Sequence, residues 1–319
     1  TVTPIIDQTQ DEDFGTLNLG PKSNFFNQNG GTALSFQIDS ITSPIVTLDD
    51  STVNLILNSL EHANGSTDIF IRATDVAGNS VVSDPFNVLV NAVNDPPVAI
   101  DDFFTTNEDT VLNGASNVFA ANPTTPDSDV ENDLFTVTEV NGMSGDVDNQ
   151  IALGSGALLT LNSNGTFAYD PNGQFEHLAF GQSTTDSFTY TIDDGTGSLI
   201  TTDTATVTIT INGVNDAPTV SAAVSTTKTE DDASFNLDLL TNASDVDNGA
   251  VLSITTPVLT GGDDSGVFLN ANLTSFDIDP SFYNHLAVGE SEVITYTYNV
   301  IDGLGGVVAQ TATITINGV

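Results

Sequence analysis

The sequence predicts an all-β chain made of three tandem β-sandwich domains in a linear array. One strand pattern, in which apolar and polar residues alternate, occurs three times, at residues 86–93, 205–214 and 312–319. The first two copies run directly into linkers that contain Asn-Asp and proline, at residues 94–97 and 215–218. A strand that closes each repeat and a linker that follows it indicate successive domains of one kind.

The linkers divide the 319 residues into domains at 1–95, 96–216 and 217–319. Each piece is near the usual domain size of roughly 100 residues. A hydrophobic content of 39%, with 18 Phe, is enough to build three small sandwich cores.

The strands inside the domains follow from period-two alternation, which is typical of half-buried β-strands. It is clearest at residues 68–75, 186–194 and 292–300, whereas helical patterns are nearly absent. Nine Asn-Gly steps favour tight turns between the strands. These signals predict antiparallel sheets joined by short connections.

The second and third domains share a longer pattern. Both carry His-Leu-Ala-x-Gly, at residues 177–181 and 285–289, followed by a strand that contains Tyr190 in one and Tyr296 and Tyr298 in the other. This arrangement resembles the tyrosine corner of immunoglobulin-like sandwiches. The first domain is a shorter variant of the same pattern.

The charge of the chain excludes some classes of partner. Three Lys and Arg against 43 Asp and Glu give a net charge of −40, and a phosphate backbone would find no basic patch, so no nucleic acid is expected. No apolar run approaches the roughly 20 residues of a membrane span, so no membrane insertion is expected. Such an excess of negative charge repels itself, and ordered cation binding would offset it.

The chain has no Cys, which removes disulfides, thiolate metal sites and cysteine catalysis. An extracellular array without disulfides needs another means of stabilisation. No signal peptide or sorting tail is visible, and we expect a fragment from the middle of a longer protein.

Acidic clusters recur in register along the chain. Each domain begins with such a cluster, at residues 11–13, 107–109 and 230–232. Domains two and three have a second cluster in a later loop, at residues 129–133 and 245–248, and a third near their end, at residues 193–195 and 302–303. Carboxylates that face one another are unfavourable unless a hard cation binds them, and Ca²⁺ takes six to eight oxygen ligands. Mg²⁺ wants fewer protein ligands, and Zn²⁺ lacks its Cys and would find only one His per domain. The sequence therefore predicts calcium.

The linkers, the early Glu, the Asp-x-Asp/Glu loop and the late Asp-Gly loop together resemble the calcium set of cadherins. They also resemble the bacterial cadherin-like and VCBS-type repeats of large RTX adhesins. The resemblance covers the whole chain, with domains two and three similar to the VCBS type and domain one similar to a shorter bacterial cadherin-like type. It implies Greek-key sandwiches of immunoglobulin or cadherin type, with calcium ions held between consecutive domains.

The resemblance also implies which residues bind metal. The ligands of the first joint would be Glu12, Asn94, Asp95, Asp129, Glu131, Asp133 and Asp193. Those of the second joint would be Glu108, Asn215, Asp216, Asp245, Asp247 and Asp302. The chain departs from the family because it lacks the Asp-Arg-Glu motif of animal cadherins, and Asp170 and Asp279, each before Pro, are candidate replacements.

Enzymatic activity is not expected. A glycoside hydrolase site would need a cleft lined with aromatic residues, and the chain has no Trp. Gly-x-Ser-x-Gly, His-Glu-x-x-His and Walker motifs are also missing from the sequence. We interpret His177 and His285 as structural residues of a sandwich corner.

The sequence therefore favours a calcium-rigidified extender of a secreted bacterial cell-surface adhesin. It would be extracellular and monomeric, and would project a distal binding domain for adhesion or biofilm formation. The alternative is a module that recognises a cell-surface glycan or protein through domain 1–95, with Phe25, Phe26 and Phe36 as a candidate platform, although a role as core residues is the favoured interpretation of these side chains. A third alternative is homophilic adhesion through edge strands.

Overall fold

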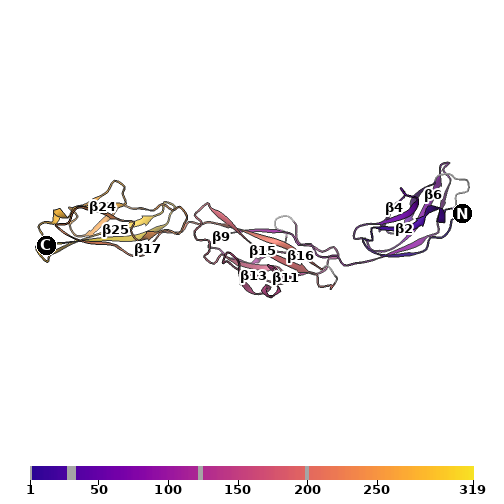
Figure 1. The fold of residues 1–319 in the computed structure, drawn as a ribbon, viewed down its shortest axis with the longest axis horizontal. Helices are drawn as coiled ribbons and strands as arrows, with labels where there is room; N and C mark the ends of the chain where they lie inside the picture. The colour runs from indigo at the N-terminus through magenta and orange to yellow at the C-terminus, as the bar shows by residue number, and fades with distance from the viewer. Residues whose placement is uncertain (1, 27–33, 121–124, 198–200) are drawn as a thin grey trace. The chain divides into compact units, whose positions relative to one another are not determined.

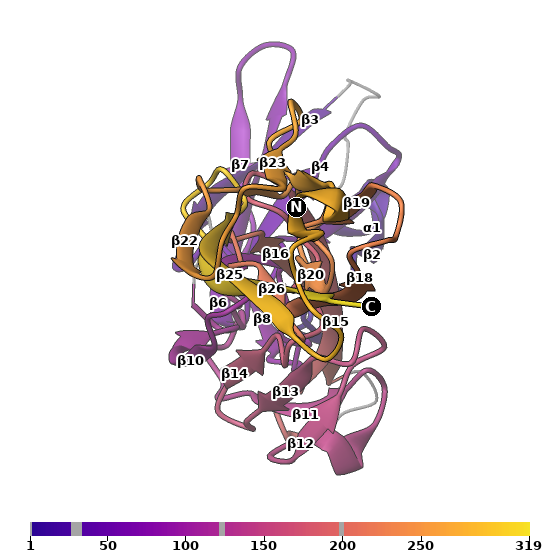
Figure 2. The same ribbon diagram turned by 90° about the vertical axis from the view of Figure 1, so that its left-hand side faces the viewer.

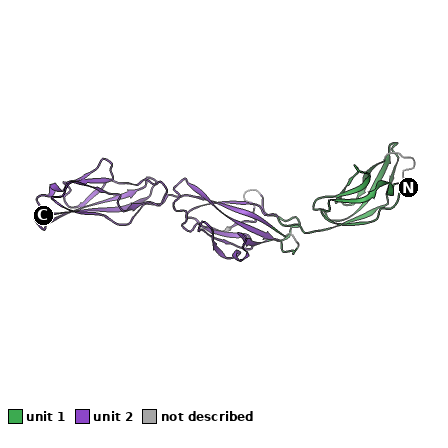
Figure 3. Ribbon diagram, viewed as in Figure 1, with its two compact units in different colours: residues 1–97, 128–135, 194–202 green, residues 98–127, 136–193, 203–319 purple. Residues whose placement is uncertain are grey.

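The computed structural model describes residues 2–26, 34–120, 125–197 and 201–319, which form strands joined by short turns (Figure 1). Strands make up 50% of the chain and helices 4%, so the predicted all-β class is confirmed. The chain divides into two compact units (Figure 3). The first unit contains residues 1–97, 128–135 and 194–202, and the second contains residues 98–127, 136–193 and 203–319.

The first domain has two sheets. One sheet has the order β1-β8-β6-β3, with β7 paired to β6, and is formed by β1 (Gln8–Asp11), β8 (Phe86–Asn91), β6 (Gly65–Asp75), β3 (Leu34–Ile41) and β7 (Ser80–Val82). The other has the order β2-β5-β4, with β2 (Thr16–Pro21), β5 (Asn54–Ser59) and β4 (Val46–Asp49). The short helix α1 (Lys22–Phe25) follows β2. Among the described residues, no helix is long and apolar enough to span a membrane.

The second domain repeats this plan. One sheet has the order β11-β15-β16-β9, with β11 (Thr136–Val140), β15 (Ser183–Asp193), β16 (Thr202–Asn212) and β9 (Asp102–Asn107). The other has the order β10-β14-β13-β12, visible in Figure 2, with β10 (Leu112–Asn117), β14 (Thr166–Asp170), β13 (Leu158–Leu161) and β12 (Gln150–Ala152). A 3-10 turn, η1 (Ser144–Asp146), lies between β11 and β12.

The third domain has three sheets. The largest has the order β18-β26-β25-β21 with β22 paired to β25, and contains β18 (Val224–Thr229), β26 (Val307–Asn317), β25 (Ser291–Ile301), β21 (Ser253–Ile254) and β22 (Val258–Gly261). The second contains β19 (Phe235–Asp238), β24 (Ser275–Ile278) and β23 (Val267–Leu269). The third pairs β17 (Thr219–Val220) with β20 (Ala243–Ser244), and η2 (Pro280–Tyr283) follows β24.

An early strand of each domain runs parallel to its last strand. The three pairs are β1 with β8, β9 with β16, and β18 with β26. In each pair the two strands end level, which aligns Asp11 with Asn91, Asn107 with Asn212 and Thr229 with Asn317. The acidic residue that follows the early strand is thereby placed beside the start of the linker.

The cores consist of the inward-facing residues of the alternating strands. In the third domain, Ile294, Ile314 and Ile316 are fully buried. The Tyr298 hydroxyl donates a hydrogen bond to the Leu239 carbonyl at 2.7 Å, 59 residues upstream, whereas the hydroxyl of a tyrosine corner bonds the backbone only a few residues upstream, so the expected tyrosine corner is not the arrangement found. Tyr190 occupies the same place in the second domain and is 0% exposed.

Tyr190 faces a buried pair of carboxyl groups. Its hydroxyl lies 2.9 Å from Asp127 Oδ2, and the Asp127 Oδ1 atom accepts a hydrogen bond from the Ile100 N–H. Asp102 is 2% exposed, and its Oδ2 atom has no hydrogen-bond partner in the described part of the chain. Burial, and then the neighbouring Asp127, raise the pKa of Asp102 from 3.8 to about 7.

This raised pKa predicts that the second domain loses stability as the pH rises. Between about pH 4 and pH 7 the folded chain keeps a proton on Asp102 that the unfolded chain has released, so unfolding releases a proton and becomes easier with rising pH. Asp102→Asn should remove the contribution of Asp102 to this dependence, while that of Asp127, whose pKa burial also raises, stays, and it should raise the free energy of unfolding at pH 8 by at most about 4 kcal/mol. Urea unfolding of both proteins from pH 5 to pH 8, in saturating calcium, measures the difference. Parallel pH profiles of the free energy of unfolding for the two proteins would contradict this prediction.

Candidate metal centre

A glutamate follows the early parallel strand in all three domains, and its side chain points to the end of the last strand. Glu12, Glu108 and Glu230 are 6%, 2% and 7% exposed. In each, one carboxylate oxygen accepts a hydrogen bond from a backbone N–H two residues beyond the last strand, which pairs Glu12 with Val93, Glu108 with Val214 and Glu230 with Val319. The glutamate is therefore fixed beside the linker. The second oxygen of Glu12 accepts a hydrogen bond from the Asn64 amide group at 3.1 Å, whereas those of Glu108 and Glu230 are buried without a partner among the described residues.

In the second unit, Glu108 meets two aspartates, and we call these residues the second carboxylate cluster. Ligand atoms of Glu108, Asp216 and Asp247 lie within 4.8 Å of one another. The Asp216 backbone N–H donates to Asp247 Oδ2 at 3.0 Å, which holds the linker against the loop of the third domain. The Asp247 N–H in turn donates to Asp245 Oδ1 at 2.9 Å. Four predicted ligands are thus brought together.

Several oxygens around this cluster are buried and have no hydrogen-bond partner among the described residues. They are Glu108 Oε2, Asn215 Oδ1, Asp216 Oδ2, Asp245 Oδ2 and Asp247 Oδ1. A buried acceptor without a partner costs about 1–3 kcal/mol. At 4.8 Å, two unit charges repel by about 3.5 kcal/mol at an effective dielectric constant near 20. Burial raises the pKa of Glu108, and burial followed by repulsion from Asp247 raises the pKa of Asp216.

Asn215 and Asp302 lie next to this cluster. The Asn215 amide group donates to Asp302 Oδ2 at 2.8 Å and to the Asp216 carbonyl at 3.0 Å, so the amide oxygen is the atom left without a partner. The hydrogen bond from Asn215, together with the N–H groups of residues 304–306, lowers the pKa of Asp302. Asp302 is thereby held ionised and orients Asn215.

The first unit contains an equivalent group, the first carboxylate cluster, formed by Glu12, Asp95 and Glu131. Their ligand atoms lie within 4.8 Å of one another, and the Asp95 N–H donates to Glu131 Oε2 at 3.4 Å. Asp129 Oδ1 accepts the N–H of Glu131 at 2.9 Å and that of Asp133 at 3.0 Å, while Asp129 Oδ2 is buried without a partner in the described residues. Burial raises the pKa of Glu131.

The amide group of Asn94 donates to Asp194 Oδ2 at 2.8 Å, so Asp194 occupies the place that Asp302 has in the second unit. The sequence assigned this place to Asp193, which is the last residue of β15 and pairs with Thr136 in the ladder. The signal was present in the sequence, because β25 ends at Ile301 and Asp302 follows it, as Asp194 follows β15. Asp133 contributes its backbone N–H to Asp129, and its carboxylate is in neither cluster.

Two further aspartates considered from the sequence fill local roles. Asp170 Oδ1 accepts the N–H of Asn172 at 2.8 Å, and Asp279 Oδ1 accepts the N–H of Ser281 at 3.1 Å. These bonds cap turns, and neither residue is part of a cluster of metal-binding geometry in the described chain. The turn is therefore the role that the structure gives them.

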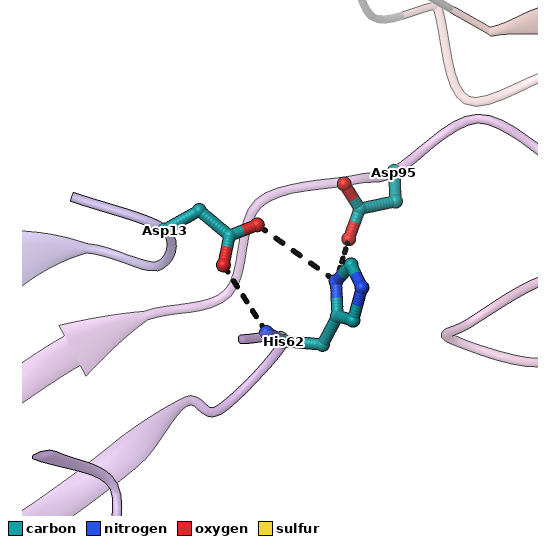
Figure 4. Close-up of side chains that lie close together, drawn as sticks. All are labelled: Asp13, His62 and Asp95. Carbon is teal, nitrogen blue, oxygen red and sulfur yellow. Dashed lines mark hydrogen bonds and ion pairs between the residues drawn. The ribbon is translucent and has the colours of Figure 1, made fainter. Parts of the chain in front are cut away.

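A third group lies beside the first cluster, and sequence analysis missed it. We call Asp13, His62 and Asp95 the histidine cluster (Figure 4). His62 Nδ1 lies 2.8 Å from Asp95 Oδ2 and 3.8 Å from Asp13 Oδ2, and the His62 N–H donates to Asp13 Oδ1 at 3.1 Å. The hydrogen bond to Asp95 raises the pKa of His62. The Glu61-His62 dipeptide parallels Glu176-His177, but sequence spacing gave no sign that it reaches the linker.

The donor set of the two carboxylate clusters fits calcium. Carboxylates, a side-chain amide oxygen and backbone carbonyls are hard oxygen ligands of the kind that Ca²⁺ prefers. The unpartnered buried oxygens of the second cluster are atoms that a cation would satisfy. Residues 108, 215, 216, 245 and 247 would hold such an ion in the second unit, and residues 12, 95, 129 and 131 in the first. A bound ion would supply positive charge that offsets the repulsion between them.

Two stretches of the chain match known protein families. Residues 94–213 match the family of the bacterial cadherin-like domain, and residues 214–317 match the family of the cadherin-like domain. The chain contains bacterial cadherin-like domains in tandem. No curated protein matches the chain.

The cadherin-like domains are also similar to solved cadherin structures. Mouse Cadherin-23 EC22-24 aligns over 99% of this chain and 96% of its own, with 14% identity and a TM-score of 0.51. Human CDH23 EC21-23 aligns over 99% and 98%, with 14% identity and a TM-score of 0.46. Protocadherin Gamma B7 EC1-4 aligns over 99% and 75%, with 13% identity and a TM-score of 0.45. At such identities the likeness shows the fold alone.

The second carboxylate cluster predicts a substitution whose effect changes sign with calcium. In chelator, Asp247→Asn should raise the melting temperature, by about 5 °C, because it removes one of three mutually repelling charges. In calcium it should lower the melting temperature, because a ligand is lost. Scanning calorimetry in both conditions measures the two shifts.

The matched control is Asp146→Asn, which removes a charge from the same unit outside both carboxylate clusters. It should shift the melting temperature little, and equally, with and without calcium. Shifts of one sign for Asp247→Asn in both conditions would show that the cluster holds no cation.

Proposed function

We propose that the chain is a calcium-rigidified extender of a secreted bacterial cell-surface adhesin of the RTX type, with VCBS-type repeats. It would act outside the cell as a non-enzymatic spacer, folded as domains 1–95, 96–216 and 217–319. Calcium ions would tie the end of each domain to the linker and to a loop of the next. Contact with a cell-surface glycan or protein would fall to a distal domain of the parent adhesin, in adhesion or biofilm formation.

The observation that carries this proposal is the repeated convergence of acidic oxygens on each linker. Each carboxylate cluster combines a glutamate that follows an early strand, an aspartate of the linker and an acidic residue from the loop that precedes β11 or β21. In the second cluster all three residues carry a buried oxygen without a partner among the described residues. A cation there would restrict the linker, because its ligands come from three separate segments.

The energetics of calcium suit an extracellular spacer. Extracellular modules bind Ca²⁺ with dissociation constants of roughly 10⁻⁴ to 10⁻³ M, so the ion would load outside the cell and leave the linkers loose inside it. At a calcium concentration about a hundredfold above the dissociation constant, each independent ion adds about 2.7 kcal/mol. That is a large share of the stability of a small domain.

The recognition alternative finds no support in its proposed platform. Phe26 and Phe36 are 2% and 6% exposed, and their rings pack edge to face at 5.2 Å in the core of the first domain. Phe25 is partly buried against the same core. Phe26 and Phe36 therefore belong to the sandwich core, and Phe25 packs against it.

A calcium titration of the chelated chain tests the extender. The melting temperature should rise by about 10 °C or more, and the distribution of the radius of gyration, measured by small-angle X-ray scattering, should narrow as the linkers stiffen. An unchanged melting temperature together with an unchanged radius of gyration would end the proposal.

The paired variants Asp95→Ala and Asp216→Ala show whether the effect is local. Each removes the linker ligand of one carboxylate cluster and leaves the other intact. Spin labels placed on either side of each linker should report loosening only at the substituted linker. Equal loosening of both linkers by either variant would contradict local calcium ties.

A further inference from the structure

We propose that the histidine cluster of the first unit, Asp13, His62 and Asp95, is a separate metal position that binds a first-row transition metal such as Zn²⁺. It differs in chemistry from the carboxylate clusters, because one of its ligands is an imidazole nitrogen. It goes beyond the proposed extender function and does not depend on it.

The geometry brings three ligand atoms onto one point. His62 Nδ1, a carboxylate oxygen of Asp13 and one of Asp95 lie within 4.8 Å of one another, and Figure 4 shows both carboxylates turned toward the ring. Nδ1 is 2.8 Å from Asp95 Oδ2 and 3.8 Å from Asp13 Oδ2. Zinc bonds of about 2.0–2.2 Å to nitrogen and oxygen require only small side-chain rotations here. Three protein ligands and a water would complete a tetrahedral site.

One further residue is placed near the other nitrogen of the His62 ring, where an outer-shell partner of a metal-binding histidine usually lies. Histidines that bind metal through one nitrogen usually have a carboxylate or carbonyl near the other. The Glu61 carboxylate lies 3.6 Å from His62 Nε2, on the opposite side of the ring from Asp13 and Asp95. A slight approach of Glu61 would fix the ring with Nδ1 toward the metal.

The second unit has related residues, but their side chains do not form a second group of this geometry among the described residues. Asp109 and Asp216 are the counterparts of Asp13 and Asp95, because each pair consists of the residue after the buried glutamate and the linker aspartate. There the neighbouring group is the Glu176 carboxylate, whose pKa is raised by burial and then by Asp216 and Asp109. His177 is exposed, and its carbonyl accepts the N–H of Asn248 at 3.0 Å.

The exchange of a carboxylate for an imidazole changes the metal preference of the position. Imidazole suits zinc, copper, nickel and iron, whereas carboxylate, carbonyl and water suit calcium and magnesium. The position that contains His62 would therefore favour a transition metal, whereas the neighbouring first carboxylate cluster would favour a hard cation.

Isothermal titration of the untagged, chelated and desalted chain with Zn²⁺ tests this site, with excess Mg²⁺ present to occupy diffuse carboxylate sites. The wild type should show one site that His62→Asn weakens at least tenfold, since loss of an outer-shell partner alone costs about 10–100-fold in affinity. Asparagine is chosen because His62 has φ 54°, a conformation that asparagine tolerates. Asp13→Asn, at φ 57°, should weaken the same site.

The matched control is His177→Asn, which removes the equivalent histidine of the second domain and should leave zinc affinity unchanged. In the NMR spectrum, Zn²⁺ should shift the imidazole signals of His62 and leave those of His177 and His285 in place. Equal zinc affinity of His62→Asn and the wild type, or an equal loss in His177→Asn, would overturn the proposal. The extender function is tested by the separate calcium titration, so neither of these results would contradict it.

Discussion

The parallel pairing between an early strand and the last strand of each domain sets the geometry of the domain ends. Since both strands stop level, the residue after the early strand lies beside the residues that begin the linker. A glutamate at that point reaches a backbone N–H beyond the last strand, as Glu108 does with Val214. One oxygen of Glu108 is used in this bond, and the other is buried without a partner among the described residues. The candidate metal position is therefore a consequence of strand register.

Burying an ionised carboxyl group is unfavourable in free energy, and the chain contains two kinds of buried carboxyl group. Asp102 lies in the second domain beside Asp127, and the protonated form is favoured because burial and the neighbouring carboxyl group raise the pKa of Asp102. At the linkers, several carboxylates converge with buried oxygens that have no partner among the described residues. The counterpart of Asp102 in the third domain is the buried Val224, level with Ala312 as Asp102 is with Val207. A carboxyl group at this place is thus not required by the fold.

The same backbone framework carries different candidate metal-ligand side chains in the two units. The glutamate and the linker aspartate keep their places in both units, while the third position of the cluster changes from Glu131 to Asp247. Beside them in the first unit lies His62, whose Nδ1 atom is 2.8 Å from Asp95 Oδ2, and the described part of the second unit has no histidine-containing group of that geometry. Backbone hydrogen bonds fix the framework, and the side chains that face the linker are free to set which ion is preferred.

The sequence by itself determined the all-β class, the repeat and the acidic residues of the linkers, because period-two alternation and recurring motifs are local properties of the chain. It also identified Glu12, Glu108, Asp95, Asp216, Glu131 and Asp247, which the structure brings together. Only the tertiary structure decided that Asp194, rather than Asp193, bonds to Asn94, because a shift of one residue at a strand end turns a side chain to the other face. The place of His62 beside Asp95 was likewise decided by folding, since 33 residues separate them along the chain.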